Sequence, residues 1–299
     1  MHPTLPRSPQ GPYAPHANPC AHKPISNPTM NLDIEAGANV PPIKVYPDKF
    51  ADQVVLVTGG AQGIGAVTAE LFGAQGAQLV LLDIQEEKLR KEVALIEAAG
   101  GKAAYQICDI TNETSVQNAV DWVISTFHKI DILANIAGIY PSADITETST
   151  EMYRRTMSLN VDGTFFLTRA IIPHMRRAGY GRIIHTSSTT TQEPEKGQVA
   201  YVTSKAAVVG LVRATSNEAG AGVTVNAVMP GLIKTDVVWS LGVQPDGSHP
   251  LFDGVIQKQN VKRCGLPADV AHAFCFVASP EASFITGQIF DIGGGETFH

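Results

Sequence analysis

Short apolar runs alternate with helix-like patterns along most of the chain. The runs are rich in Val, Ile and Leu with few polar interruptions, which is typical of strands covered on both faces in a parallel sheet. Between them, apolar residues recur three and four positions apart, as in Val116, Val120, Val123 and Phe127, which indicates amphipathic helices. We expect strands at 53–58, 78–83, 102–108, 130–135, 182–187, 223–228 and 287–292.

This alternation defines the fold class. Strand, helix and strand in succession form right-handed units that build an α/β protein with a doubly wound parallel sheet. Ligands bind such sheets at the carboxyl ends of the strands. Functional residues are therefore expected where the strands end.

Residues 1–48 have a different composition. Eleven of the nineteen prolines lie among the first fifty residues, and apolar residues are sparse there. Such a segment cannot bury enough surface to offset the entropy of ordering it. We expect a proline-rich tail at 1–48, disordered or loosely docked, and one catalytic domain at 49–299.

Composition and charge narrow the functional classes. The formal net charge is −6, and Lys and Arg form no cluster, so nucleic acid is not expected as a partner. The four cysteines lack the spacing of a zinc site, and no metal is expected. No apolar run approaches the roughly 18 residues of a membrane helix, and the N-terminus lacks a signal-peptide pattern. We expect a cytoplasmic protein without membrane contact.

A glycine-rich segment directly follows the first expected strand. Residues 58–65 read TGGAQGIG and lead into a helical pattern that continues to about Gln75. Glycines let the backbone approach a pyrophosphate closely, and free N–H groups at a helix start favour an anion. Glycines also serve turns for purely conformational reasons, so the position between strand and helix is what favours a nucleotide site. The residues expected to contact a dinucleotide here are Gly59, Gln62, Gly63, Ile64 and Gly65.

An acidic residue ends the second expected strand. Asp83 lies 18 residues beyond Gly65, close to the spacing of about 20 at which a carboxylate holds the adenosine ribose hydroxyls. The same charge would repel the 2′-phosphate of NADP, and neither Gln62 nor Ile84 supplies a cation to attract it. We therefore predict NAD as the cofactor. The alternative for Asp83 is a solvated acid at a strand end.

A tyrosine and a lysine lie four residues apart in an expected helix at about 198–219. Tyr201 and Lys205 project from the same face of that helix. A free phenol has a pKa near 10, and a neighbouring ammonium favours the phenolate. We expect Lys205 to lower the pKa of Tyr201 by two to three units, which needs about 3 to 4 kcal/mol of differential interaction. Taken alone, such a pair also arises by chance.

Two further polar residues fit this pair. Ser188 follows the expected strand at 182–187 and is placed to hydrogen-bond a substrate oxygen, with Ser187 as the competing choice. Asn160 lies in an expected long helix at about 150–176. Each has a structural alternative: a loop serine, a helix-interior amide, a core tyrosine or a surface lysine. His185 is expected to be a hydrogen-bonded core histidine rather than a catalytic one.

Together these motifs identify the chain from residue 50 to residue 299 as resembling a short-chain dehydrogenase/reductase. The resemblance implies a seven-stranded Rossmann sheet and a catalytic tetrad in which Ser188 orients the carbonyl and Tyr201 is the acid/base. Lys205 would bind the ribose and lower the tyrosine pKa, and Asn160 would hold a relay water. The motifs that carry the resemblance are Thr58-Gly59-x-x-x-Gly63-x-Gly65, Asn135-Ile136-Ala137-Gly138, Asn160, a serine thirteen residues before Tyr201, and Tyr201-x-x-x-Lys205.

The same resemblance supplies further cofactor contacts. Asp109 would lie at the adenine, and Ile233 and Thr235 at the nicotinamide carboxamide and the phosphate. Ile136 departs from the family pattern, where many members carry a second asparagine, and the tail before Lys49 has no counterpart. The expected contacts beyond the glycine loop are Asp83, Ile84, Asp109, Ile110, Asn135, Ala137, Gly138, Tyr201, Lys205, Pro230, Gly231, Ile233 and Thr235.

The substrate side is expected to vary. The segment at about 236–264 is long, contains Trp239 and several glycines, and is interpreted as a lid over the substrate. Its apolar residues favour a mid-sized, mainly apolar alcohol or ketone. The residues expected to contact substrate are Tyr140, Ser188, Gln198, Tyr201 and Trp239.

These observations predict an enzyme that transfers a hydride between NAD(H) and a secondary alcohol or ketone, with no need of a metal. Two alternatives stay open. One is a catalytically silent dinucleotide-binding sensor or scaffold whose tail recruits a partner. The other is an NADH-dependent enone reductase of the same fold. Family resemblance further implies a homotetramer.

Overall fold

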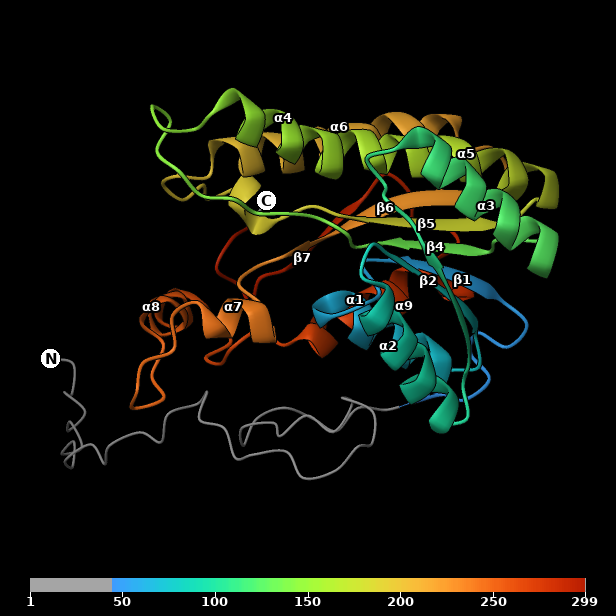
Figure 1. The fold of residues 1–299 in the computed structure, drawn as a ribbon, viewed down its shortest axis with the longest axis horizontal. Coiled ribbons are helices and arrows are strands. Elements are labelled where there is room, and N and C mark those ends of the chain that lie inside the picture. The colour runs from blue at the N-terminus through green and yellow to red at the C-terminus, as the bar shows by residue number, and fades with distance from the viewer. Residues whose placement is uncertain (1–44, 299) are drawn as a thin grey trace, which may run out of the picture.

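One parallel sheet of seven strands forms the centre of the molecule, in the order β3-β2-β1-β4-β5-β6-β7 (Figure 1). The computed structural model describes residues 45–298. The chain builds outward from β1 in one direction and then from β4 in the other, so the strand order reverses between β1 and β4 and leaves a crevice at their carboxyl ends. The strands are β1 (Val54–Thr58), β2 (Gln78–Asp83), β3 (Lys102–Ile107), β4 (Ile132–Asn135), β5 (Gly181–Thr186), β6 (Val223–Pro230) and β7 (Ile289–Ile292).

The expected strands are confirmed, each to within two residues at either end. Their apolar runs are visible in the sequence because side chains on both faces are buried: all five residues of β1 and all eight of β6 are buried. The α/β class and the doubly wound topology follow from them. Among residues 45–298, no helix combines the length and apolar character needed to cross a membrane.

Helices cover both faces of the sheet. Figure 1 shows α1, α2 and α9 on one face and α3, α4, α5 and α6 on the other. The helices are α1 (Gly63–Ala74), α2 (Glu86–Ala98), α3 (Glu113–Phe127), α4 (Thr150–Met157), α5 (Gly163–Ala178), α6 (Val199–Glu218), α7 (Asp236–Ser240), α8 (Pro250–Lys258) and α9 (Pro267–Val277), with short 3₁₀ turns at Thr189–Thr191 and Pro280–Ala282.

Each covered face has its own apolar core. Under α1 and α9, Phe50 packs edge-on against Phe72 with ring centroids 4.8 Å apart, and both side chains are fully buried. On the opposite face, Val120 of α3 and Val208 of α6 belong to the second core. Burying a large apolar side chain contributes about 1.5 to 3 kcal/mol, so these cores hold the strand ends, and with them the site, in place.

The expected single helix at 150–176 is wrong in one respect. It is divided by a π-helical turn, Ser158–Asp162, which separates α4 from α5. Such turns are single-residue insertions into a helix and occur often at functional sites. Here the turn contains Asn160, whose side chain is tied to a neighbouring loop as described below.

The expected lid folds into α7 and α8 with a small core of its own. Phe252, Ile256 and Cys264 are buried together, and Leu232, Val238 and Trp239 pack against them. Of the expected tail at 1–48, only 45–48 lie among the described residues, and Val45 contacts the core. The domain boundary at 48 and 49 stays a prediction.

Candidate active site

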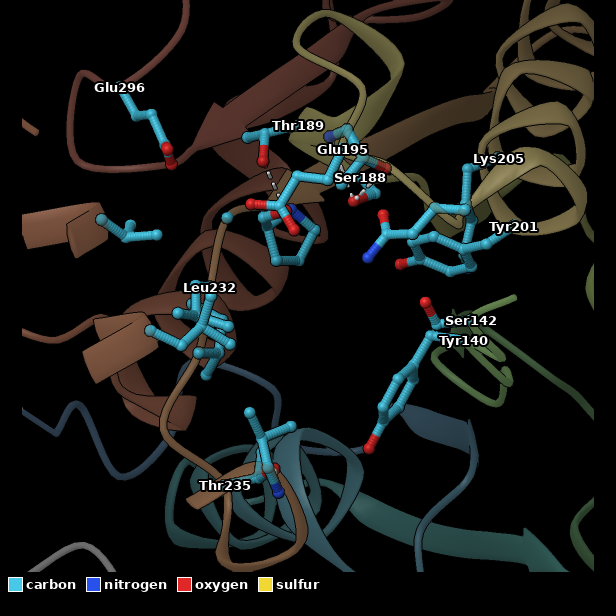
Figure 2. Close-up of a pocket in the computed structure, with 18 of the residues that line it drawn as sticks. Tyr140, Ser142, Ser188, Thr189, Glu195, Tyr201, Lys205, Leu232, Thr235 and Glu296 are labelled. Atoms are coloured by element: carbon cyan, nitrogen blue, oxygen red, sulfur yellow. Dashed lines mark hydrogen bonds between the residues drawn. The ribbon is translucent and has the colours of Figure 1, made fainter. Parts of the chain in front are cut away.

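A cavity of about 810 Å³ opens at the carboxyl ends of β4, β5 and β6. Figure 2 shows Ser188, Tyr201 and Lys205 on one side of it and Tyr140 and Ser142 below them, with Leu232 and Thr235 opposite. Because the strand ends, α6 and the lid all contribute residues, the fold brings distant segments to one place. The cavity lies at the edge of the sheet where the sequence predicts the site.

Tyr201 and Lys205 lie one helical turn apart on α6, and both line the cavity. The ammonium of Lys205 is 5.8 Å from the centre of the Tyr201 ring. The Ser188 side chain lies beside the Tyr201 phenol and favours its ionised form, which lowers the pKa of Tyr201. The three residues that sequence reasoning assigned to the chemistry therefore meet at one surface of one cavity.

The two neighbouring serines have different roles. The hydroxyl of Ser187 is buried and donates to the backbone oxygen of Lys205 at 3.1 Å, so it holds α6 against β5. The hydroxyl of Ser188 faces Tyr201 and accepts from the backbone and side chain of Thr190 at 3.3 and 3.0 Å. Ser188 therefore has its hydroxyl beside Tyr201, and its role toward a substrate oxygen stays a prediction.

Lys205 is held by the backbone. Its side chain is buried, and Nζ donates to the carbonyl oxygen of Thr186 at 2.8 Å. Burial lowers the pKa of Lys205 to about 8, because a desolvated ammonium is less stable than a hydrated one. At neutral pH the group is still mainly protonated, so a positive charge lies beneath the cavity floor.

The expectation that Lys205 lowers the pKa of Tyr201 is not met in this structure. Burial raises the pKa of the Tyr201 phenol, the nearby Tyr140 raises it further, and the hydrogen bond from Ser188 lowers it. Desolvation of the phenolate outweighs the hydrogen bond. The phenol is therefore protonated at neutral pH and able to donate.

Asn160 is fixed to the loop after β4. Its Oδ1 accepts from the backbone N–H of Ile139 at 3.0 Å, and its Nδ2 donates to the oxygen of Ile139 and to the hydroxyl of Ser204, both at 2.9 Å. Ser204 in turn donates to the backbone oxygen of Tyr201 at 2.7 Å. The amide side chain is therefore fully engaged, and it links the π turn, the loop and α6.

The glycine loop fits a dinucleotide. Gly59 and Gly63 have φ values of 67° and 60°, a backbone conformation that side chains disfavour. A Cβ on Gly65 would lie 2.0 Å from the oxygen of Gly59, so no other residue fits there. The N-terminus of α1 follows at Gly63 and presents free N–H groups, as an anion site requires. Gln62 and Ile64 occupy this same turn as expected.

A buried hydroxyl ties this loop to the next one. Thr58 Oγ1 donates to Asn135 Oδ1 at 2.7 Å and accepts from the backbone N–H groups of Ile136 and Ala137 at 3.0 and 3.2 Å. A Cβ on Gly59 would lie 3.1 Å from the Ala137 backbone, so the two loops are in contact. The Asn135 side chain therefore positions the loop from inside the core instead of facing a cofactor.

His185 is a hydrogen-bonded core histidine, as predicted. Its two ring nitrogens lie 3.2 Å from Asn135 Nδ2 and 3.2 Å from Thr168 Oγ1. Burial and the charge of Lys205 lower its pKa to about 3. The imidazole is neutral under ordinary conditions.

The adenosine end of the crevice carries charges of both signs. Asp83 ends β2 as expected, and its Oδ1 accepts from the backbone and side chain of Gln85 at 3.1 and 3.3 Å. Lys88 of α2 donates to Gln62 Oε1, so a cation lies beside the loop, which the local sequence did not indicate. Ile84 is exposed.

Asp109 and Ile110 follow β3. One Asp109 oxygen accepts from the N–H and the hydroxyl of Thr111 at 2.9 and 2.7 Å, which closes a turn. The Ile110 side chain is buried in the core. If this pair contacts an adenine, Ile110 does so through its backbone.

The loop after β6 reaches the glycine loop. A Cβ on Gly63 would lie 3.4 Å from Thr235 Cγ2, and the Thr235 hydroxyl accepts from Val238 N at the start of α7. Gly138 lies close to Lys205 and Asn160 at the centre of the crevice. The expected cofactor residues of this part that line the cavity are Gly138, Tyr201, Lys205, Pro230, Gly231, Ile233 and Thr235.

Apart from Ser188 and Tyr201, three residues are expected to contact substrate: Tyr140, Gln198 and Trp239. The first two line the cavity, and Trp239 does not. Tyr140 lies edge-on to Tyr201 with ring centroids 6.4 Å apart, and Gln198 also faces the cavity. Trp239 packs instead within the lid, against Phe252 at 5.3 Å and under the ammonium of Lys234. Its large apolar surface is used to fold the lid, so the expectation of a Trp239 substrate contact is not supported.

Several lining residues were not predicted. They include Leu232 and Ser142, and Val238, Leu241 and His249 of the lid. Their positions depend on how the lid folds over the sheet, and no local pattern in the sequence reveals that arrangement. The spacing of apolar residues within the lid is the one feature of the sequence that points to this arrangement.

The fold and the site define a dinucleotide-binding oxidoreductase. The sequence model of a family described as enoyl-(acyl carrier protein) reductase matches residues 59–297. Cyclopentanol dehydrogenase from Comamonas testosteroni is 36% identical over 247 residues, 82% of this chain and 97% of that protein. The 3-oxoacyl-(acyl-carrier-protein) reductase FabG from Thermotoga maritima is 33% identical over 248 residues, 83% of this chain and 98% of its own.

A solved structure is similar over the same range. A short-chain type dehydrogenase/reductase from Mycobacterium ulcerans matches with a TM-score of 0.78 and 34% identity, covering 83% of this chain and 90% of that one. The chain therefore belongs to the short-chain dehydrogenase/reductase family. Its members are oxidoreductases that bind a nicotinamide dinucleotide, either NAD or NADP.

Proposed function

We propose that the protein is an NAD-dependent dehydrogenase and reductase that interconverts a secondary alcohol and its ketone, with Tyr201 as the acid/base. The observation that carries this proposal is the convergence of Tyr201, Ser188 and Lys205 on one cavity beside the glycine loop. A proton donor, a second hydroxyl and a cation at one surface match the needs of carbonyl reduction.

The nicotinamide dinucleotide, when bound, supplies or accepts the hydride. In the reductive direction, the Tyr201 hydroxyl donates its proton to the carbonyl oxygen, while the Ser188 hydroxyl holds that oxygen by a hydrogen bond. The phenolate left on Tyr201 is stabilised by the Ser188 side chain, which favours the ionised form of the phenol. In the oxidative direction, the same phenolate removes the alcohol proton. Asn160 holds the loop after β4 and α6 in register around these groups.

The preference for NAD rests on Asp83. Its carboxylate ends β2 next to the glycine loop, where a 2′-phosphate would meet a negative charge. Lys88 opposes this effect in part, but its ammonium is exposed and already donates to Gln62. We therefore infer that NAD is favoured over NADP.

A mid-sized neutral substrate fits the lining. Tyr140, Leu232, Val238 and Leu241 give the cavity apolar walls. Three carboxylates, Glu193, Glu195 and Glu296, also line it. Among them, within the part of the chain that the structure describes, Glu193 alone forms an ion pair, with Lys258 at 3.7 Å. Their charge disfavours an anionic thioester carrier. A cyclic alcohol of the kind named for the Comamonas relative fits better than the acyl carrier named for the Thermotoga relative.

The test is a substrate screen combined with one substitution. Secondary alcohols with NAD, and ketones and enones with NADH, are followed at the nicotinamide absorbance. We expect turnover of alcohols and ketones and a loss of at least 10²-fold in kcat for Tyr201→Phe, because a general acid contributes about 10² to 10⁴-fold. NADH binding, measured by fluorescence, should persist in that variant.

The other outcomes identify the alternatives. Turnover of enones alone would indicate the enone reductase. NADH binding without any turnover across the screen would indicate the silent sensor or scaffold. Unchanged turnover in Tyr201→Phe would refute the assigned role of the phenol.

We also propose a cytoplasmic homotetramer. Phe165 of α5 and Phe276 of α9 expose 40% and 50% of their surface, and Phe284 is fully exposed. These side chains lie on separate elements and form no single apolar patch, so the proposal rests mainly on the resemblance to the family. Light scattering coupled to size-exclusion chromatography measures the assembly directly, and a monomer at micromolar concentration would contradict this proposal.

A further inference from the structure

One polar side chain in the wall of the cavity has buried ring nitrogens with no partner. His249 precedes α8 in the lid, exposes only 3% of its surface and lines the cavity. Within the part of the chain that the structure describes, neither Nδ1 nor Nε2 has a hydrogen-bond partner. The other polar side chain of the lid that lines the cavity, Gln244, donates to the oxygen of Gly242 at 3.2 Å.

The neighbours of His249 explain why a ring is buried here, but not why that ring carries polar nitrogen atoms. The ring lies 4.9 Å from Trp239 and 4.8 Å from Phe252, centroid to centroid. Aromatic neighbours suit a phenyl ring better than an imidazole, because buried polar atoms without partners cost free energy. A phenylalanine would pack in this lid core at no such cost. The imidazole therefore indicates a partner that residues 45–298 do not provide.

The His249 ring packs tightly against Gly242. A Cβ on Gly242 would lie 2.7 Å from Cε1 and 2.9 Å from Nε2 of His249. Gly242 also lines the cavity. Glycine at this position therefore leaves room for the imidazole in the cavity wall, and any side chain at 242 would displace the edge of the ring that carries Nε2.

We propose that His249 is the substrate-recognition residue of the lid and that it hydrogen-bonds a second hydroxyl group of the substrate, remote from the reacting carbon. A neutral imidazole has one donor and one acceptor, and a hydroxyl group likewise both donates and accepts. The substrate class is then a diol or a hydroxyketone instead of a simple alcohol. This inference rests on the proposed function, since it assigns the substrate of the same site.

The experiment compares matched substrates. The wild type and His249→Phe are assayed with cyclohexanol and with cyclohexane-1,2-, 1,3- and 1,4-diol in the presence of NAD. We expect the wild type to prefer at least one diol over cyclohexanol. In His249→Phe the ratio of kcat/KM for that diol to kcat/KM for cyclohexanol should fall at least tenfold, with the change in KM and not in kcat. His249→Gln, which keeps a donor and an acceptor, should restore part of the ratio.

Two controls separate recognition from lid stability. Phe252→Leu loosens the same lid core without removing a polar atom, so it should lower the thermal midpoint and leave the substrate ratio within twofold. His249→Phe should keep or raise the thermal midpoint, because it removes buried nitrogens that have no partner. Gly242→Ala, which crowds the ring edge, should lower the ratio as His249→Phe does.

Failure of this inference differs from failure of the proposed function. If no diol is preferred by the wild type, or if His249→Phe changes all substrates equally, the inference is overturned while the alcohol dehydrogenase stands. If no alcohol or ketone is turned over at all, the proposed function fails and this inference with it.

Discussion

Replacing Thr58 by valine tests how the dinucleotide crevice is held together. Thr58 ends β1 and is fully buried. Its hydroxyl makes three hydrogen bonds, to Asn135 Oδ1 at 2.7 Å and to the N–H groups of Ile136 and Ala137 at 3.0 and 3.2 Å. Valine has nearly the same shape and makes none of them. The substitution therefore removes polar contacts while leaving the packing almost unchanged.

The expected loss follows from the number of groups left without a partner. One hydrogen bond contributes about 0.5 to 1.5 kcal/mol net, and a buried polar group without a partner costs about 1 to 3 kcal/mol. The hydroxyl serves three such groups, which are coupled through one atom, so we expect Thr58→Val to lower the free energy of unfolding by about 2 to 4 kcal/mol. Urea unfolding followed by circular dichroism measures this change.

NADH affinity gives a second measurement on the same variant. The loop that begins at Ile136 lies against Gly59, so its loosening should also weaken NADH binding, measured by fluorescence titration. Thr215→Val is the matched control, because the Thr215 hydroxyl donates only to backbone oxygens of its own helix. We expect the control to change stability by less than about 0.5 kcal/mol. A Thr58→Val protein as stable as this control would refute the reasoning.

Three further substitutions test separate parts of the site. Gly65→Ala should abolish NADH binding seen by fluorescence, because its Cβ would lie 2.0 Å from the oxygen of Gly59; binding within threefold of wild type would contradict the close contact. Asp83→Ala should weaken NAD binding and strengthen NADP binding in calorimetric titration, and an unchanged ratio would reject Asp83 as the selecting residue. The pKa of His185 is lowered to about 3, so below pH 6.5 only the unfolded state gains its proton and stability falls by up to about 1.4 kcal/mol per pH unit. His185→Gln should show a smaller fall between pH 7 and pH 4.5 in urea unfolding, and parallel curves would disprove this.

Much of the fold could be predicted because burial leaves a local record. Strands covered on both faces are apolar throughout, and β2 was placed at its observed bounds from that pattern alone. The break in the helix at Asn160 leaves no such record, since it depends on hydrogen bonds to Ile139, which is 21 residues away. Helical periodicity continues on both sides of the turn and hides it.

Site residues could be predicted where the spacing along one helix fixes their positions. They were harder to predict where their positions depend on how side chains pack. Tyr201 and Lys205 share a helix face, so their spacing sufficed. The prediction that the pKa of Tyr201 is lowered was wrong. Burial of the phenol raises the pKa more than its neighbours lower it, and the extent of that burial cannot be read from the sequence. Trp239 and His249 likewise could not be placed from the sequence. The indole lies in the core of the lid, and the imidazole lies in the cavity wall.

The π turn at Ser158–Asp162 limits how this chain tolerates changes in length. Deleting one residue from it would yield a continuous α-helix with an unbroken hydrogen-bond ladder. Every side chain on one flank would then rotate by about 100° relative to the other flank. Local backbone geometry would improve while α4 lost its alignment with α6. A shortened helix that looks more regular is thus a route to an inactive protein, and insertions or deletions are better tolerated in the solvent-facing turns at the opposite end of the sheet.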